Sequence, residues 1–209
     1  EAPVSAIMGA VAKHVFLVTD ANRLEATMRA AFELARTGRP GPVVLDIPKD
    51  VQNWEGEFRG TGTLPLTGYR ARLQAVVDNR LSDESCQRLY AMLAESERPL
   101  IYAGGGVVSA NASEALRAFA RRFGIPVTTT LMGIGACDTN DPLALRMLGM
   151  HGAAAANYAV DYCDFLIAIG ARFDDRVIGD PKHCASVERK IIHVDIDPSS
   201  ISKRVRVDI

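Results

Sequence analysis

The chain of 209 residues is 48% hydrophobic and 23% charged, with a formal net charge of −1, which is typical of a globular protein with a substantial core. This charge gives no support for a nucleic-acid or membrane surface, and no apolar run approaches the roughly 18 residues that span a bilayer. The cysteines fit no CxxC pattern and the histidines show no metal-ligand spacing, so we expect reduced thiols, a cytoplasmic location and no metal site. The chain starts with neither Met nor a signal-peptide pattern, so we expect a piece of a longer protein.

Residues 1–51 predict one strand–helix–strand unit. Apolar runs at 15–18 and 43–47 fit the strands, and apolar residues recur at helical spacing from Leu24 to Arg36. About 50 residues bury too little surface to form a domain alone, so we expect the last part of a domain that begins earlier. Residues 52–79 are rich in glycine, lack sustained periodicity and predict a linker.

From residue 80 onward, predicted helices and strands alternate. The predicted strands lie at 100–103, 127–130, 165–169, 191–194 and 205–209, and those at 165–169 and 191–194 are short apolar runs without polar alternation. Predicted helices precede or connect them: one capped by Ser82 and ended by Pro99, and others at 113–123, 142–148 and 153–162. This alternation predicts an α/β fold with a doubly wound parallel sheet, Rossmann-like in its connections and preceded by the partial α/β unit.

Glycine-rich or polar segments follow four of these strands. They are Gly104–Gly106, Leu131–Gly135, Gly170–Arg176 and Asp195–Asp197. Because the carboxyl ends of parallel strands meet at one edge of a sheet, these segments predict a ligand crevice there. Glycines let backbone N–H groups approach a phosphate, Arg172 can neutralise a phosphate or lie over a conjugated ring, and Asp195 can accept hydrogen bonds from ribose hydroxyls.

Two of the glycine motifs also have structural interpretations. The GGG segment is not GxGxxG and equally fits a tight strand–helix turn, while LGMHG equally fits a turn with Met150 in the core. No GxSxG, HExxH or P-loop motif occurs. The residues alone therefore favour a nucleotide-binding domain, with no catalytic residue assigned.

Several motifs, taken in order, resemble the catalytic subunit of acetolactate synthase (acetohydroxyacid synthase), a thiamine diphosphate-dependent family. They are RPGPVVLDIPKD, GGG, TTLMGIGA, LGMHG with ANYAV, DFLIAIGARFDDRV and HVDIDPSSISK. The resemblance covers nearly all of the chain. It implies that residues 1–51 are the C-terminal remnant of a pyrimidine-binding domain. It also implies that residues 80–209 are the central FAD-binding domain, and it leaves open whether that domain is complete at its C-terminus.

The family's FAD contacts carry over to residues at the predicted sheet edge and to one arginine before the domain. By resemblance, the FAD-contacting residues are Arg72, Gly104, Gly105, Gly106, Thr130, Leu131, Met132, Gly133, Gly149, Met150, His151, Gly170, Ala171, Arg172, Asp174, Arg176, Val177, Asp195, Ile196 and Asp197.

The resemblance also implies a reaction for the whole protein. The parent would condense two pyruvates, or pyruvate and 2-oxobutyrate, with loss of CO2, in branched-chain amino-acid biosynthesis. Thiamine diphosphate and Mg2+ would bind outside residues 1–209, FAD would be largely structural, and the isolated chain would be inactive. Expected partners are the remaining domains, a second catalytic subunit in a homodimer or tetramer, and a small regulatory subunit.

Three alternatives stand beside this assignment, one within the same class of enzyme and two from other classes. The first is another carboligase of the same superfamily, such as glyoxylate carboligase. The second is a free-standing nucleotide-binding module without catalysis. The third, an NAD-dependent deacylase on a similar sheet, is disfavoured because the sequence offers no convincing zinc site.

Overall fold

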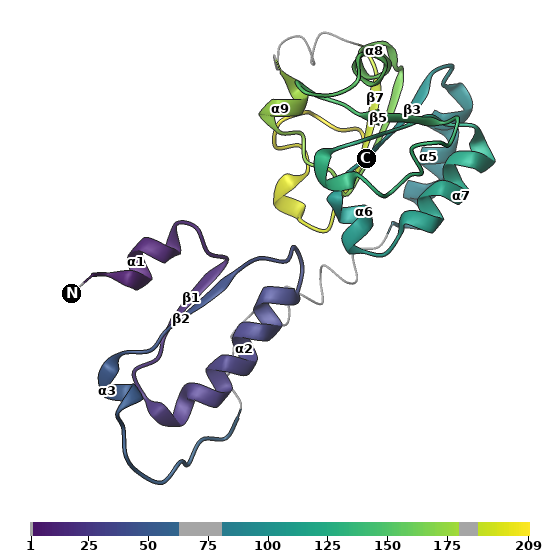
Figure 1. Ribbon diagram of the computed structural model, residues 1–209. Coiled ribbons are helices and arrows are strands. Elements are labelled where there is room, and N and C mark those ends of the chain that lie inside the picture. The colour runs from purple at the N-terminus through teal and green to yellow at the C-terminus, as the bar shows by residue number, and fades with distance from the viewer. Residues whose placement is uncertain (1, 63–80, 180–187) are drawn as a thin grey trace. The chain divides into compact units, whose positions relative to one another are not determined.

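A computed structural model of the chain describes residues 2–62, 81–179 and 188–209. The chain divides into two compact units, unit 1 from Glu1 to Arg80 and unit 2 from Leu81 to Ile209 (Figure 1). The assignment of residues 1–51 to a pyrimidine-binding domain stays a prediction, and much of the predicted linker lies outside the described residues.

Unit 1 contains the predicted strand–helix–strand unit. Its elements are α1 (Val4–Gly9), β1 (His14–Leu17), η1 (Ala21–Arg23), α2 (Leu24–Arg36), β2 (Val43–Asp46) and α3 (Lys49–Gln52). Strands β1 and β2 pair in parallel, with Phe16 opposite Leu45. The Asp20 carboxylate accepts a hydrogen bond from the Asn22 N–H at 3.0 Å and caps η1, which leads directly into α2.

Unit 2 is built on a five-stranded parallel sheet in the order β5-β4-β3-β6-β7. The strands are β3 (Pro99–Ala103), β4 (Val127–Thr129), β5 (Ala144–Met147), β6 (Phe165–Ile169) and β7 (Lys190–Val194). The helices and helical turns are α5 (Asp83–Glu95), α6 (Gly105–Ser109), α7 (Ser113–Phe123), η2 (Leu131–Gly133), α8 (Ala154–Tyr162), α9 (Asp175–Ile178) and η3 (Pro198–Ser200).

Helices cover both faces of this sheet (Figure 1). On one face, α5 and α7 pack against Ile101, Phe165 and Ile167. On the other face, α8 and α9 pack against Leu100 and Leu166. Because both faces are covered, the central strands are apolar throughout, and the predicted doubly wound α/β fold is confirmed.

One predicted helix was wrong. Residues 142–148 were expected to form a short helix, but they contain strand β5. The Leu143 carbonyl accepts a hydrogen bond from the Val127 N–H at 2.8 Å, and the Thr128 hydroxyl donates to the Arg146 carbonyl at 2.9 Å. Arg146 has a φ of 68°, and the pairing register shifts beside it. This irregularity hides the strand from a search for regular alternation.

The predicted strand at 205–209 is not a regular strand, although its backbone lies along β7. The Asp208 N–H donates to the Ile191 carbonyl at 2.8 Å, and the His193 N–H donates to the Ile209 carbonyl at 2.9 Å. These two backbone hydrogen bonds, with a third from the Ile191 N–H to the Asp208 carboxylate at 2.9 Å, hold this segment against the edge strand of the sheet.

The strand order places a switch point between β3 and β6. From β3 the chain moves outward to β4 and β5, then crosses back to β6 and β7 on the other side of β3. The loops after β3 and β6 thus leave in opposite directions. In open α/β sheets this is the position where ligands bind, outside the carboxyl ends of the strands.

Candidate functional site

The turns after β3 and β6 are in direct contact at the switch point. The Gly104 N–H donates to the Ile169 carbonyl and the Gly106 N–H to the Gly170 carbonyl, both at 2.9 Å. A Cβ on Gly104 would lie 2.1 Å from the Gly170 carbonyl oxygen, and Gly170 has a φ of 56°. These glycines are needed first for the two turns to pack, which agrees with the tight-turn interpretation of GGG. Their contact with a phosphate stays a prediction.

The loop after β4 packs against the end of β3 and presents two apolar side chains. The Thr130 hydroxyl caps η2 by accepting a hydrogen bond from the Gly133 N–H at 2.9 Å, and the Thr130 N–H donates to the Ala103 carbonyl at 2.9 Å. Leu131 and Met132 remain 68% and 75% exposed. Large apolar side chains this exposed are available to a ligand or another surface.

The loop after β5 reaches the start of α9. Gly149 has a φ of 97°, and both its N–H and its carbonyl are bonded to the Asn157 side chain, at 2.7 and 3.0 Å. The Met150 N–H donates to the Arg176 carbonyl at 3.1 Å. Met150 is 64% exposed and His151 is exposed, so the interpretation of Met150 as a core residue was wrong.

The turn after β6 alternates buried and exposed side chains. Ala171 and Phe173 are buried, while Arg172 between them is exposed. No hydrogen bond or ion pair within the described part of the chain involves the Arg172 guanidinium, but its carbonyl accepts from the Tyr102 hydroxyl at 2.9 Å. Burial, with the negative charge of Asp174 nearby, raises the pKa of the Tyr102 phenol, so this hydroxyl remains a donor.

The segment after β7 keeps its acidic side chains close to the backbone. Asp195 accepts from the Asp197 N–H at 2.8 Å through one carboxylate oxygen, and its other oxygen lies 3.8 Å from His193 Nε2. Asp197 accepts from the Ser199 N–H at 3.0 Å and caps η3. Asp195 therefore has one oxygen without a close hydrogen bond, whereas Asp197 serves first as a cap. Ile196 is 53% exposed.

The structure brings four of the five loops into contact, the fifth follows the neighbouring strand β7, and we name all five the edge loops. They are residues 104–106, 130–133, 149–151, 170–177 and 195–197. The loop after β3 touches those after β4 and β6. The loop after β6 in turn touches the loop after β5 and residues of β7. Every candidate residue except Arg72 lies in these loops, and Arg72 lies outside the described residues.

Sequence reasoning missed four residues that hold the edge loops. They are Tyr102, Asn157, Phe173 and His193. One signal was present, since tyrosine and histidine within buried strands need hydrogen-bond partners. Asn157 is likewise a lone amide in an alanine-rich helix.

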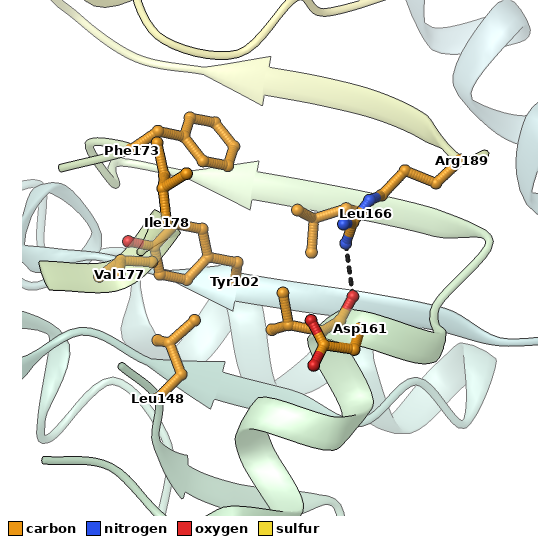
Figure 2. A pocket seen from close by; sticks show the side chains of 9 residues that line it. Tyr102, Leu148, Asp161, Leu166, Phe173, Val177, Ile178 and Arg189 are labelled. Atoms are coloured by element: carbon orange, nitrogen blue, oxygen red, sulfur yellow. Dashed lines mark hydrogen bonds between the residues drawn. The ribbon is translucent and has the colours of Figure 1, made fainter. Parts of the chain in front are cut away.

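A small pocket, partly open to solvent, lies beside the turn after β6 (Figure 2). Tyr102, Phe173 and Val177 line its apolar end, and Arg189 lies at the other end. The Arg189 guanidinium donates to the Val160 carbonyl in the last turn of α8, where a cation is favourable. Val177 thus faces this pocket, and the pocket shares residues with the edge loops.

The chemistry available at the edge loops is that of binding. The edge loops carry exposed apolar side chains (Leu131, Met132, Met150, Ile196). They also carry the Arg172 guanidinium and the Asp195 carboxylate. Among residues 2–62, 81–179 and 188–209, no group of three or more His, Cys, Asp or Glu could hold a metal ion. In that part of the chain, no helix is both long and apolar enough to cross a membrane.

Comparison with known proteins identifies the family. The model for the central domain of thiamine pyrophosphate enzymes matches residues 86–209, so the chain belongs to this family.

The similar proteins are acetolactate synthases. A probable acetolactate synthase large subunit of Methanocaldococcus jannaschii is 50% identical over 202 residues, covering 95% of this chain and 33% of that protein. The chloroplastic acetolactate synthase 1 of Zea mays is 46% identical over 203 residues, covering 97% of this chain and 31% of that protein. The large subunit of Corynebacterium glutamicum is 44% identical over 209 residues, covering 100% and 32%. The chain spans about a third of the length of these relatives.

Proposed function

We propose that unit 2 binds FAD at its edge loops, as the central domain of an acetolactate synthase. The observation that carries the proposal is that the five edge loops follow the carboxyl ends of the five parallel strands, with the loops after β3 and β6 in direct contact at the switch point. Similarity to acetolactate synthases over 95% or more of the chain supports the family assignment, and FAD is the nucleotide that the resemblance to this family implies.

The residues present fit a flavin nucleotide. Its pyrophosphate needs a cation, and the Arg172 guanidinium is exposed without an ion pair in the described chain. Its hydroxyl groups need acceptors. One Asp195 oxygen has no close hydrogen bond, and the buried Asp174 Oδ1 has no partner within the described residues. Its flat ring system needs apolar contacts, which Met132 and Met150 offer.

On this proposal the complete protein condenses pyruvate with pyruvate or 2-oxobutyrate and releases CO2. Thiamine diphosphate, with Mg2+, supplies the carbanion chemistry at a site outside residues 1–209, and FAD is not oxidised or reduced in the carboligation. Residues 1–51 belong to the pyrimidine-binding domain. A second catalytic subunit and a small regulatory subunit are the proposed partners, and the cytoplasm is the proposed location. The identity of 44–50% to three acetolactate synthases supports this assignment.

The test of the site is a titration with FAD, followed by quenching of flavin fluorescence. Arg172→Ala should raise the dissociation constant roughly tenfold to 150-fold, because a charge-assisted hydrogen bond contributes ~1.5–3 kcal/mol. Arg122→Ala is the matched control, since Arg122 is an exposed arginine on α7, away from the edge loops. Equal affinities for the two variants would remove Arg172 from the site, and absence of FAD binding by the wild type would defeat the proposal.

The test of the reaction is formation of acetolactate from pyruvate. The complete protein should form it in the presence of thiamine diphosphate, Mg2+ and FAD, whereas residues 1–209 alone should not. A complete protein that binds FAD but forms no acetolactate would separate the binding site from the assigned reaction.

A further inference from the structure

Three residues stand in register on the adjacent strands β3, β6 and β7. Tyr102 pairs with Ala168, and Ala168 pairs with His193. Because residues in register on parallel strands point to the same face, the three side chains form a row across the sheet. All three are buried, and the small middle residue leaves space between its two larger neighbours.

Phe173 occupies that space from the turn after β6. Its ring centroid lies 5.6 Å from that of Tyr102 and 5.2 Å from that of His193, with the His193 ring edge-on at 81°. Phe173 is 8% exposed. An aromatic ring held at two such contacts anchors the turn onto the face of its own strand.

The same two strand residues hold consecutive carbonyl groups of the turn. The Tyr102 hydroxyl donates to the Arg172 carbonyl at 2.9 Å, and His193 Nε2 lies 2.8 Å from the Ala171 carbonyl. A carbonyl oxygen only accepts, so Nε2 carries the proton of this hydrogen bond. The turn after β6 is therefore hydrogen-bonded by a side chain from each of the two strands, β3 and β7, that flank β6.

We propose that Tyr102 and His193 are positioning residues for Arg172. We name Tyr102, His193 and Phe173 the latch, because together they hold the backbone of residues 171–173 against the sheet. The Arg172 side chain is left exposed between two buried neighbours. The latch rests on the proposed function, because the ligand that Arg172 meets is the FAD pyrophosphate. A guanidinium on a fixed backbone loses less conformational freedom when it binds than one on a loose turn.

Cleavage by trypsin tests the latch without FAD. Trypsin cuts the peptide bond after Arg172, and the carbonyl of that bond is the one that the Tyr102 hydroxyl holds. In the complete protein, Tyr102→Phe should speed cleavage at Arg172 about fivefold relative to Tyr158→Phe, which alters an exposed tyrosine on α8. His193→Leu should act likewise, and His193→Gln should restore slow cleavage because its amide can donate. Unchanged rates in both Tyr102→Phe and His193→Leu would overturn the latch.

A double-mutant cycle tests the positioning role. Tyr102→Phe should raise the dissociation constant for FAD about twofold to tenfold in the wild-type background and leave it unchanged in the Arg172→Ala background. If Tyr102 had a merely structural role, Tyr102→Phe would raise the dissociation constant for FAD by the same factor in both backgrounds, and that result would overturn the proposal. An unchanged affinity in Tyr102→Phe also overturns it while the FAD site stands. If the wild type binds no FAD, the proposed function and the positioning role fail together.

Discussion

Substituting Gly104 by alanine tests the contact between the turns after β3 and β6. The backbone of Gly104 has φ −106° and ψ −177°, an extended conformation that alanine adopts without strain. The difficulty is space, since the new Cβ would lie 2.1 Å from the Gly170 carbonyl oxygen and 2.4 Å from the Ala171 Cα. Both atoms are backbone, so no side chain can rotate out of the way.

The expected cost is about 3 kcal/mol of unfolding free energy, at the upper end of the ~1–3 kcal/mol range for overpacked cores. Separating the two turns also stretches the hydrogen bonds from Gly104 to Ile169 and from Gly106 to Gly170. Each contributes roughly 1 kcal/mol. The control is Gly124→Ala, where φ is 66° but the new Cβ meets nothing within 4 Å. That variant should lose only the ~1–2 kcal/mol of left-handed strain.

The assay is urea unfolding followed by circular dichroism. The transition of unit 2 should move further in Gly104→Ala than in Gly124→Ala. If Gly104→Ala costs no more than Gly124→Ala, the close packing of the two turns is refuted.

Two further predictions concern residues that hold loops in place. Asn157→Ala removes both hydrogen bonds to Gly149, so it should lower the free energy of unfolding in urea by about 1–3 kcal/mol and weaken FAD binding. An unchanged free energy of unfolding together with an unchanged affinity for FAD would contradict the bridging role of Asn157. Burial raises the pKa of Asp164, but hydrogen bonds from Ser96 and two backbone N–H groups outweigh it and hold that pKa below its usual range. Its contribution is therefore present above about pH 4 and lost as the pH falls further. Asp164→Asn should show a smaller loss of stability on acidification from pH 6 to pH 3, and identical pH dependence would contradict this.

The sheet of unit 2 was predictable because its central strands β3 and β6 are apolar runs and helix signals separate the strands. Ser82 caps α5 by accepting from the Ser85 N–H at 3.1 Å, as its pattern predicted. The irregular strand β5 was not predictable, since the positive φ of Arg146 and the register shift depend on pairing with β4.

The contacts within the candidate site depend on long-range packing. The sequence places Gly104 and Gly170 at strand ends, but the need for glycine arises only when the two turns touch. In the sequence, Tyr102 and His193 resemble ordinary core residues, and their role is visible only because both bond to carbonyls of the same turn. The edge loops were therefore located from sequence, whereas the residues that hold them were not.

The most direct test of the central claim is hydrogen–deuterium exchange of the complete protein with and without FAD. Binding at the carboxyl edge of the sheet should slow amide exchange in the edge loops, most strongly in the loops after β3 and β6, and leave α5 and α7 unchanged. FAD binding with protection elsewhere, and none in the edge loops, would contradict the assignment of this site.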